Sequence, residues 1–166
     1  RQGAEEGSAR ALLAEHLAEH LITMTDIYIA GIAMTVFGRH PERGLPDLAG
    51  EALQGALKDA GCTTADLGVA FYAGMTNGPL QGQIAIPGQV VFSRIGIEGI
   101  PIYNVENACA SGSTAVHLAL QSLRAGATDV ALALGAEKMN IPDKAKAWED
   151  LLLARRTLAR LTETGP

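Results

Sequence analysis

Residues 100–135 read IPIYNVENACASGSTAVHLALQSLRAGATDVALALG and place one cysteine, Cys109, between an apolar run and a helical pattern. The run at 100–105 predicts a strand. Small residues from 111 onward, followed by periodic leucines, predict a helix that Gly126 ends. Residues 129–139 predict a further strand. The strand–turn–helix–strand order puts Cys109 at the carboxyl end of a strand, where open sheets gather their ligands.

The same alternation extends toward the N-terminus. A β-rich run at 27–34 and an apolar run at 67–74 predict two more strands. Between them, residues 45–61 carry a helical stripe with Gly61 as the expected C-cap, made of Leu48, Ala52, Leu53, Ala56 and Leu57. Residues 75–89 read as a loop and 90–96 as a helix end. We expect an α/β fold in βαβαβαβ order, with a mostly parallel mixed sheet covered by helices on both faces.

Composition limits the function classes. The 166 residues are 48% hydrophobic and 19% charged, which fits one globular domain with appendages. A formal charge of −5 and 4% aromatic residues argue against nucleic acid as a partner. No apolar run reaches the roughly 18 residues of a membrane span. Two cysteines and no secretory signal predict a cytoplasmic protein.

The chain divides into three predicted parts. Residues 1–23 read as an extension with one amphipathic helix, and Met24 resembles a natural start. Residues 24–144 hold the alternating pattern and form the main domain. Residues 145–166 read as a charged, helical tail.

Two interpretations of Cys109 stay open at this point. At a helix N-terminus the dipole and the free N–H groups favour a thiolate, and Asn107 is a candidate cap for that helix. Small residues from Ser111 to Thr114 leave room for a ligand to approach. Against this, a lone cysteine between two alanines is often an inert apolar filler.

Residues 104–139, NVENACASGSTAVHLALQSLRAGATDVALALGAEKM, resemble the thiolase superfamily. The similarity is close to the thiolases and to the thiolase-like sterol-carrier or lipid-transfer proteins of acyl-CoA metabolism. It extends over about residues 24–144, with IYIAGIAMTVFGRHP as first strand and DLAGEALQGALKDAG as first helix. The chain then corresponds to the N-terminal half of a duplicated fold.

The resemblance implies a function. Cys109 would be acylated by a coenzyme A thioester, with 3-ketoacyl-CoA thiolysis or Claisen condensation as the reaction. Coenzyme A thioesters would be substrates, with no tightly bound cofactor and no metal. A homodimer or a complementary subunit is implied too, because the family pairs its third strand, here residues 100–105, across a two-fold axis.

The family's activating histidine, in a Gly-His-Pro context, and its second cysteine, in a Cys-x-Gly context, do not occur here. The chain is therefore a fragment of a longer thiolase, a natural half, or a degenerate member. The alternative function is a non-catalytic thiolase-like subunit for lipid binding or assembly.

The remaining sequence patterns give weaker evidence of function. His16 and His20 form an H-x-x-E-H pattern known in zinc peptidases, but a solvated helix face explains it better. Cys62 reads as inert. A structural role suits Glu106, because a carboxylate beside a thiolate opposes its ionisation. No catalytic duty is expected for the loop residue His40 or for His117, and Glu137, Lys138 and Met139 only mark the family.

Overall fold

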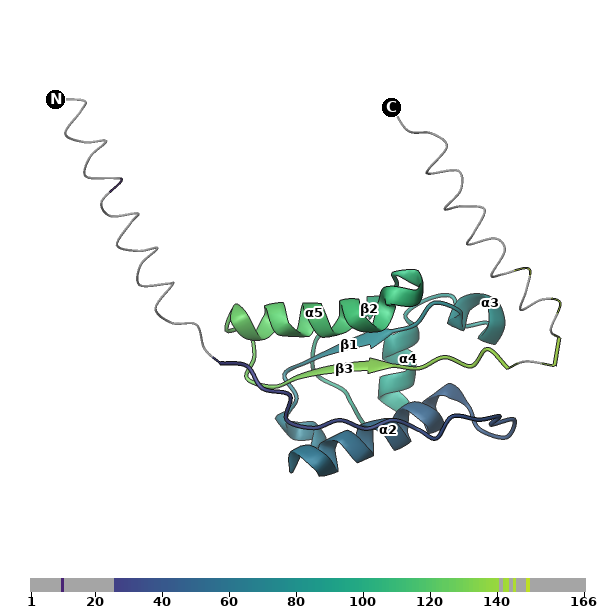
Figure 1. Ribbon diagram of the computed structural model, residues 1–166, viewed down its shortest axis with the longest axis horizontal. Helices are drawn as coiled ribbons and strands as arrows, with labels where there is room; N and C mark the ends of the chain where they lie inside the picture. Colours follow the sequence, from purple (N-terminus) through teal and green to yellow (C-terminus); the bar gives the residue numbers. More distant parts are fainter. Residues whose placement is uncertain (1–9, 11–25, 141, 144, 146–148, 150–166) are drawn as a thin grey trace.

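The computed structural model describes residue 10, residues 26–140 and residues 142, 143, 145 and 149 (Figure 1). The predicted N-terminal helix, its H-x-x-E-H pattern and most of the C-terminal tail lie outside the described residues. The domain boundaries at residues 24 and 144 stay predictions.

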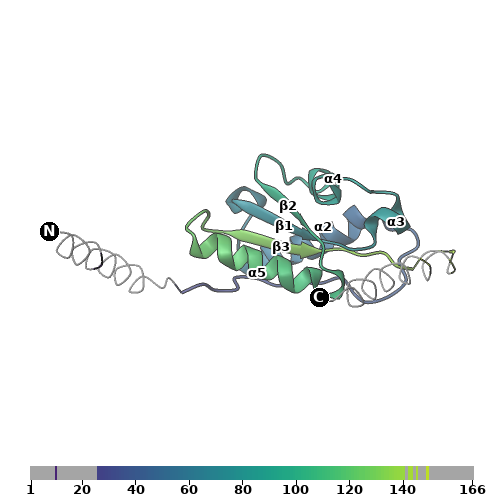
Figure 2. The ribbon, with the colours of Figure 1, turned by 90° about the horizontal axis from the view of Figure 1, so that it is seen from above.

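Three parallel strands form the sheet, in the order β2-β1-β3. They are β1 (Val69–Ala73), β2 (Ile102–Val105) and β3 (Ala131–Gly135). Phe71 in the central strand lies opposite Tyr103 on one side and Ala133 on the other. Figure 2 shows the strands side by side. The predicted α/β class with a parallel sheet is confirmed.

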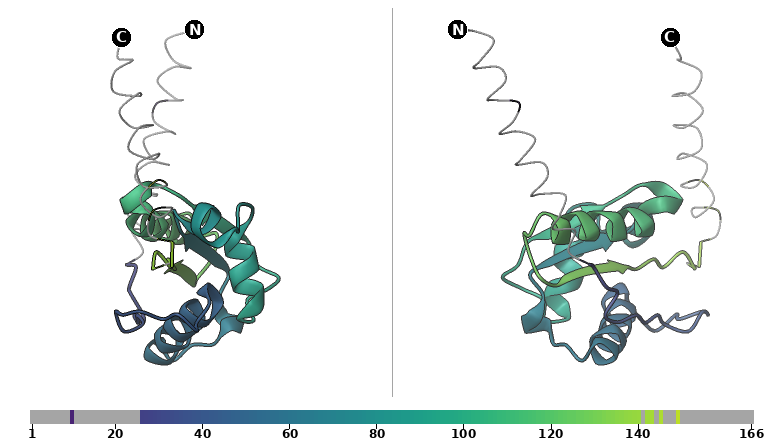
Figure 3. Two further views of the ribbon diagram at one scale, coloured as in Figure 1. Left: turned by 90° about the vertical axis from the view of Figure 1, so that its right-hand side faces the viewer. Right: turned by 60° about the vertical axis from the view of Figure 1, so that its left-hand side comes forward.

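Helices cover both faces of the sheet. Helices α2 (Leu45–Ala60) and α4 (Pro87–Arg94) pack on one face, and α5 (Ser111–Arg124) packs on the other (Figures 1 and 3). Alternate residues of β1 belong to the two cores. Ala70 and Tyr72 face α2 and α4, whereas Val69, Phe71 and Ala73 face α5. All five β1 residues are buried, as expected for a strand covered on both sides.

Local chemistry sets the helix limits. Helix α2 begins after Gly44, whose N–H donates to Asp47 Oδ2 at 2.8 Å, and ends at the predicted cap Gly61, where φ is 66°. The expected loop at 75–89 instead contains α3 (Asn77–Gln81) and the first turn of α4, because Pro87 suits the start of a helix. Among the described residues, no helix combines the length and the hydropathy that a bilayer crossing requires.

The strand predicted at residues 27–34 is wrong. This segment has no regular structure and crosses α2, where the Ile32 N–H donates to Asp59 Oδ2 at 2.9 Å. Gly55 permits the close approach, because a Cβ on it would lie 2.6 Å from the Ala33 Cβ. The segment therefore packs on α2 and does not extend the sheet at either edge, beside β2 or β3. Apolar side chains of the segment, such as Ile29 and Ile32, are exposed.

Candidate active site at the carboxyl end of the sheet

Cys109 lies where the sequence placed it, between β2 and α5. Strand β2 ends at Val105, the 3-10 turn η2 (Ala108–Ala110) follows, and α5 begins at Ser111. The cysteine is free and exposed. Figure 1 shows this turn at the same end of the molecule as α3. Since Cys109 is exposed and precedes the N-terminal end of a 14-residue helix, the interpretation as an inert filler loses its main support, which was burial.

The turn before Cys109 has an unusual backbone. Ala108 adopts φ 47°, a left-handed conformation that residues with a Cβ seldom take. Its N–H donates to Glu106 Oε1 at 2.7 Å, and its carbonyl accepts the Ser111 hydroxyl at 2.8 Å. Ser111 Oγ in turn accepts the Asn107 N–H at 2.8 Å. Glu106 therefore has the structural role that the sequence favoured.

Asn107 does not cap the helix with its side-chain oxygen, and that prediction is wrong. Its side-chain amide donates to Thr114 Oγ1 at 3.0 Å. Ala110 occupies the N-cap position of α5, without a side-chain cap. The 3-10 turn η2 leaves Asn107 three residues before the N-cap Ala110, too far for the predicted bond, and Ser111 supplies the local hydrogen bonds instead.

Glu137 and Lys138, which follow β3, hold two loops against this edge of the sheet by hydrogen bonds. The Glu137 carboxylate accepts the N–H groups of Met75 and Thr76 and the Thr76 hydroxyl, with Thr76 N at 3.1 Å from Oε1. Lys138 Nζ donates to the carbonyls of Arg43 at 2.6 Å and Pro41 at 3.2 Å. The sequence assigned no role to either residue. Charged side chains directly after a buried strand were the available signal.

Tyr72 and Asn77 form a buried, hydrogen-bonded pair. The Tyr72 hydroxyl donates to the Ala136 carbonyl at 3.3 Å and accepts the Asn77 side-chain amide at 2.9 Å. Burial raises the pKa of Tyr72 to about 12; the Asn77 bond lowers it and the Glu137 charge adds to the rise. Tyr72 is thus a neutral phenol at physiological pH and no general base.

A second polar contact joins β2 to the start of α4. Asn104 accepts the Gly88 N–H at 2.6 Å and donates to Gln89 Oε1 at 2.7 Å. Gln89 also donates to the Ile102 carbonyl at 3.1 Å. These hydrogen bonds hold α4 against β2, the edge strand that leads to Cys109.

The other predicted residues do not join this site. His40 Nε2 contacts the Val36 carbonyl at 2.9 Å, and His117 is exposed on α5, 3.5 Å from Gln121 Nε2. In the part of the chain that the structure describes, no three His, Cys, Asp or Glu side chains are grouped to hold a metal ion. Neither His40 nor His117, the two histidines in the described part of the chain, hydrogen-bonds to Cys109.

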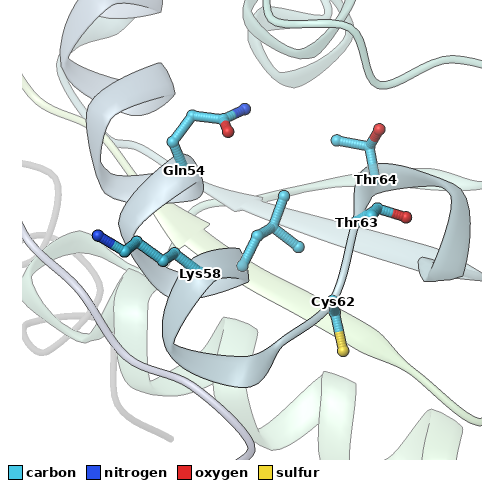
Figure 4. Close-up of a pocket in the computed structure, with 6 residues that line it drawn as sticks. Gln54, Lys58, Cys62, Thr63 and Thr64 are labelled. Carbon is cyan, nitrogen blue, oxygen red and sulfur yellow. The ribbon is translucent and has the colours of Figure 1, made fainter.

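Cys62 follows the C-terminus of α2 and is half-buried. Its Sγ contacts the Ala60 carbonyl at 3.6 Å, and its N–H donates to the Leu57 carbonyl at 2.9 Å. Figure 4 shows the shallow pocket beside it, with the sulfur directed away from Gln54 and Thr64. The side chains diverge rather than converge, so this pocket holds no catalytic arrangement.

Comparison with known proteins connects this geometry to a family. The family model described as the thiolase N-terminal domain matches residues 27–156. Sterol carrier protein 2 of Gallus gallus is 37% identical over 126 residues, which are 75% of this chain and 22% of that protein. An acetyl-CoA acetyltransferase of Methanothermobacter thermautotrophicus is 34% identical over 116 residues, 70% of this chain and 30% of the relative.

Solved structures agree with the family model. The structure of an acetyl-CoA acetyltransferase from Syntrophomonas wolfei matches with a TM-score of 0.53 and 26% identity, over 63% of this chain and 27% of that one. The chain spans less than a third of the length of each of these relatives. With a family model that covers most of its length, the chain belongs to the thiolase family, through the family's N-terminal domain.

Proposed function

We propose that this chain carries the nucleophile of a thiolase-type acyl-CoA acyltransferase, and that Cys109 accepts the acyl group. The observation that carries the proposal is the exposed cysteine in a side-chain-supported turn between β2 and α5 of a thiolase-family domain. Relatives named as acetyl-CoA acetyltransferase and benzoylsuccinyl-CoA thiolase subunit support the substrate class.

In the proposed reaction, the Cys109 thiolate attacks the thioester carbonyl carbon. A new C–S bond forms, the bond to coenzyme A breaks, and coenzyme A leaves as a thiolate that takes up a proton. In condensation this acyl group then passes to the carbanion of a second acyl-CoA, which forms a C–C bond and releases the Cys109 thiolate. In thiolysis the thiolate instead attacks the C3 carbonyl carbon of a 3-ketoacyl-CoA. The C2–C3 bond breaks, the acyl-CoA fragment leaves as a carbanion that takes up a proton, and the acyl group on Cys109 passes to coenzyme A. The first-turn N–H groups of α5 are available to favour negative charge near the sulfur.

The base that deprotonates Cys109 has no candidate among the described residues, so we propose that it comes from a second half or a partner subunit. Strand β2 lies at the sheet edge with Tyr103 half exposed and stacked on Phe71 at 5.2 Å. An open edge supports the proposal that β2 pairs with a second copy of the chain. Coenzyme A thioesters serve as substrates, and no resident cofactor is required.

A second candidate is a non-catalytic lipid-binding or assembly subunit. The observation that favours it is the name of several relatives, sterol carrier protein 2 and non-specific lipid-transfer protein-like 2. In that case Cys109 would have no covalent role.

Alkylation by iodoacetamide, with and without acyl-CoA, separates the two functions. For an acyltransferase we expect Cys109 to react faster than free N-acetylcysteine at the same pH, and acyl-CoA to slow that reaction. Cys62 in the same molecule is the internal control and should be unaffected. Labelling of Cys109 that is no faster than N-acetylcysteine and insensitive to acyl-CoA would favour the lipid-binding subunit.

A further inference from the structure

Ala108, the residue that precedes Cys109, is restrained through both of its peptide groups. Its N–H is held by the Glu106 carboxylate and its carbonyl by the Ser111 hydroxyl, at 2.7 and 2.8 Å. Ala108 has a positive φ of 47° although it is not glycine. A conformation of this kind persists only where the surroundings enforce it.

Ser111 is the more firmly fixed of the two restraining side chains. It is buried, with 6% of its surface exposed, whereas Glu106 is exposed. Its Oγ both donates to the Ala108 carbonyl and accepts the Asn107 N–H, so the hydroxyl is directed by two bonds. Because the single hydroxyl proton is donated to the Ala108 carbonyl, it is not available to a substrate.

We propose that Ser111 is a positioning residue that fixes the orientation of Cys109. Because a peptide is planar and trans, the Ala108 carbonyl and the Cys109 N–H point in opposite directions. Holding the carbonyl therefore fixes the Cys109 N–H as well, and with it the path along which the thiolate meets a carbonyl carbon. Glu106 restrains the other side of the same residue. This inference rests on the proposed acyl transfer by Cys109.

The test compares Ser111→Ala with a matched control, Ser113→Ala. Ser113 makes the same kind of bond, from Oγ to the Ala110 carbonyl at 2.9 Å, but does not touch Ala108. The acylation rate of Cys109 by acyl-CoA is measured against acyl-CoA concentration, and iodoacetamide labelling of Cys109 serves as a second readout.

For Ser111→Ala we expect a maximal acylation rate lower by about tenfold to a hundredfold, because misplacing a reacting group costs this much. The half-saturating acyl-CoA concentration and the iodoacetamide rate should stay within about twofold, since neither needs an oriented attack. Ser113→Ala should match the wild type, and Ser111→Thr, which keeps the hydroxyl, should restore the rate.

Ala108→Gly provides a second test, because the double variant Ser111→Ala/Ala108→Gly is measured against Ala108→Gly, even where Ser111→Ala alone does not fold. Glycine adopts a positive φ without steric cost, so the loss caused by Ser111→Ala should be smaller in the Ala108→Gly background. Equal acylation of wild type and Ser111→Ala, or an undiminished loss in the glycine background, would overturn the inference and leave the proposed function intact. No acylation of the wild type would overturn both.

Discussion

The two cysteines lie beside opposite poles of two helices. Cys62 follows the C-terminus of α2, where its sulfur contacts a carbonyl oxygen. Cys109 precedes the N-terminus of α5 and is exposed. The N-terminal pole of a helix favours negative charge and the C-terminal pole opposes it. The same residue type therefore meets opposite electrostatic surroundings, and the fold decides which cysteine suits a nucleophile.

The carboxyl end of the sheet and the Cys62 turn differ in how they are held. At the carboxyl end of the sheet, side chains reach across long stretches of sequence: Glu137 contacts Thr76, 61 residues away, and Lys138 contacts Arg43, 95 residues away. Near Cys62, the turn is closed locally by Asp66, which accepts the Thr63 N–H and hydroxyl three residues away. The carboxyl end is thus assembled by tertiary contacts, and the Cys62 turn by its own sequence.

Glu137→Ala tests this difference with the largest expected effect. Removing the carboxylate leaves the buried Thr76 hydroxyl and N–H without their acceptor. We expect the free energy of unfolding to fall by about 3 kcal/mol, measured by urea denaturation. Asp66→Ala is the matched control in the local turn and should cause a clearly smaller loss. Equal losses would contradict the contrast between the two regions.

Gly88→Ala probes the contact between α4 and β2. A Cβ there would lie 2.7 Å from the Tyr72 Cβ and 2.8 Å from Asn104 Oδ1, so α4 must shift. The expected cost is about 2 kcal/mol of unfolding free energy, from thermal or urea denaturation. Gly126→Ala, with open space around it but φ 66°, should cost about 1 kcal/mol. A Gly88 variant as stable as the wild type would refute this close packing.

Tyr72→Phe removes a bond to the Ala136 carbonyl and leaves the Asn77 amide without its acceptor. We expect a loss of about 1 kcal/mol in urea denaturation. Alkaline titration followed by phenolate absorbance gives a second readout. The tyrosine that ionises near pH 12 in the wild type should be absent from the variant. A wild-type titration complete by pH 11 would show that the phenol is not buried.

The smallest effect concerns acid stability at the Cys62 turn. Hydrogen bonds from the Thr63 N–H, and secondly from its hydroxyl, lower the pKa of Asp66. The stabilisation is therefore present above the ordinary value of 3.8 and is lost as the pH falls through the lowered pKa. Asp66→Asn should differ from the wild type at pH 6, and the difference should shrink as the pH falls below 3.8. A pH-independent difference in urea denaturation would exclude this titration.

The sequence predicted the parts of the molecule that depend on local pattern. Periodicity located α2 and α5 close to their observed limits, with Gly61 as a cap, and placed Cys109 between strand and helix. Strand pairing is not local, so the β-rich run at 27–34 was assigned to a sheet that it does not join. A pattern of apolar residues indicates that a segment tends to be buried. It does not indicate which strand or helix the segment packs against.

The side chains that support the candidate site could not be predicted from the sequence, for a related reason. Glu137 and Lys138 act on residues that precede them by more than 60 positions. Ser111 binds a residue close to it in the sequence, but its role depends on the positive φ of Ala108. Alanine rarely adopts a positive φ, so the sequence gives no reason to predict one there.

The most direct test of the central claim is peptide mapping by mass spectrometry. The protein from its natural source, with any subunit that copurifies, is incubated with acetyl-CoA and quenched in acid. We predict an acetyl thioester on Cys109, none on Cys62, and none at all in Cys109→Ser. An absence of acetyl on Cys109, or equal acetylation of both cysteines, would contradict the account.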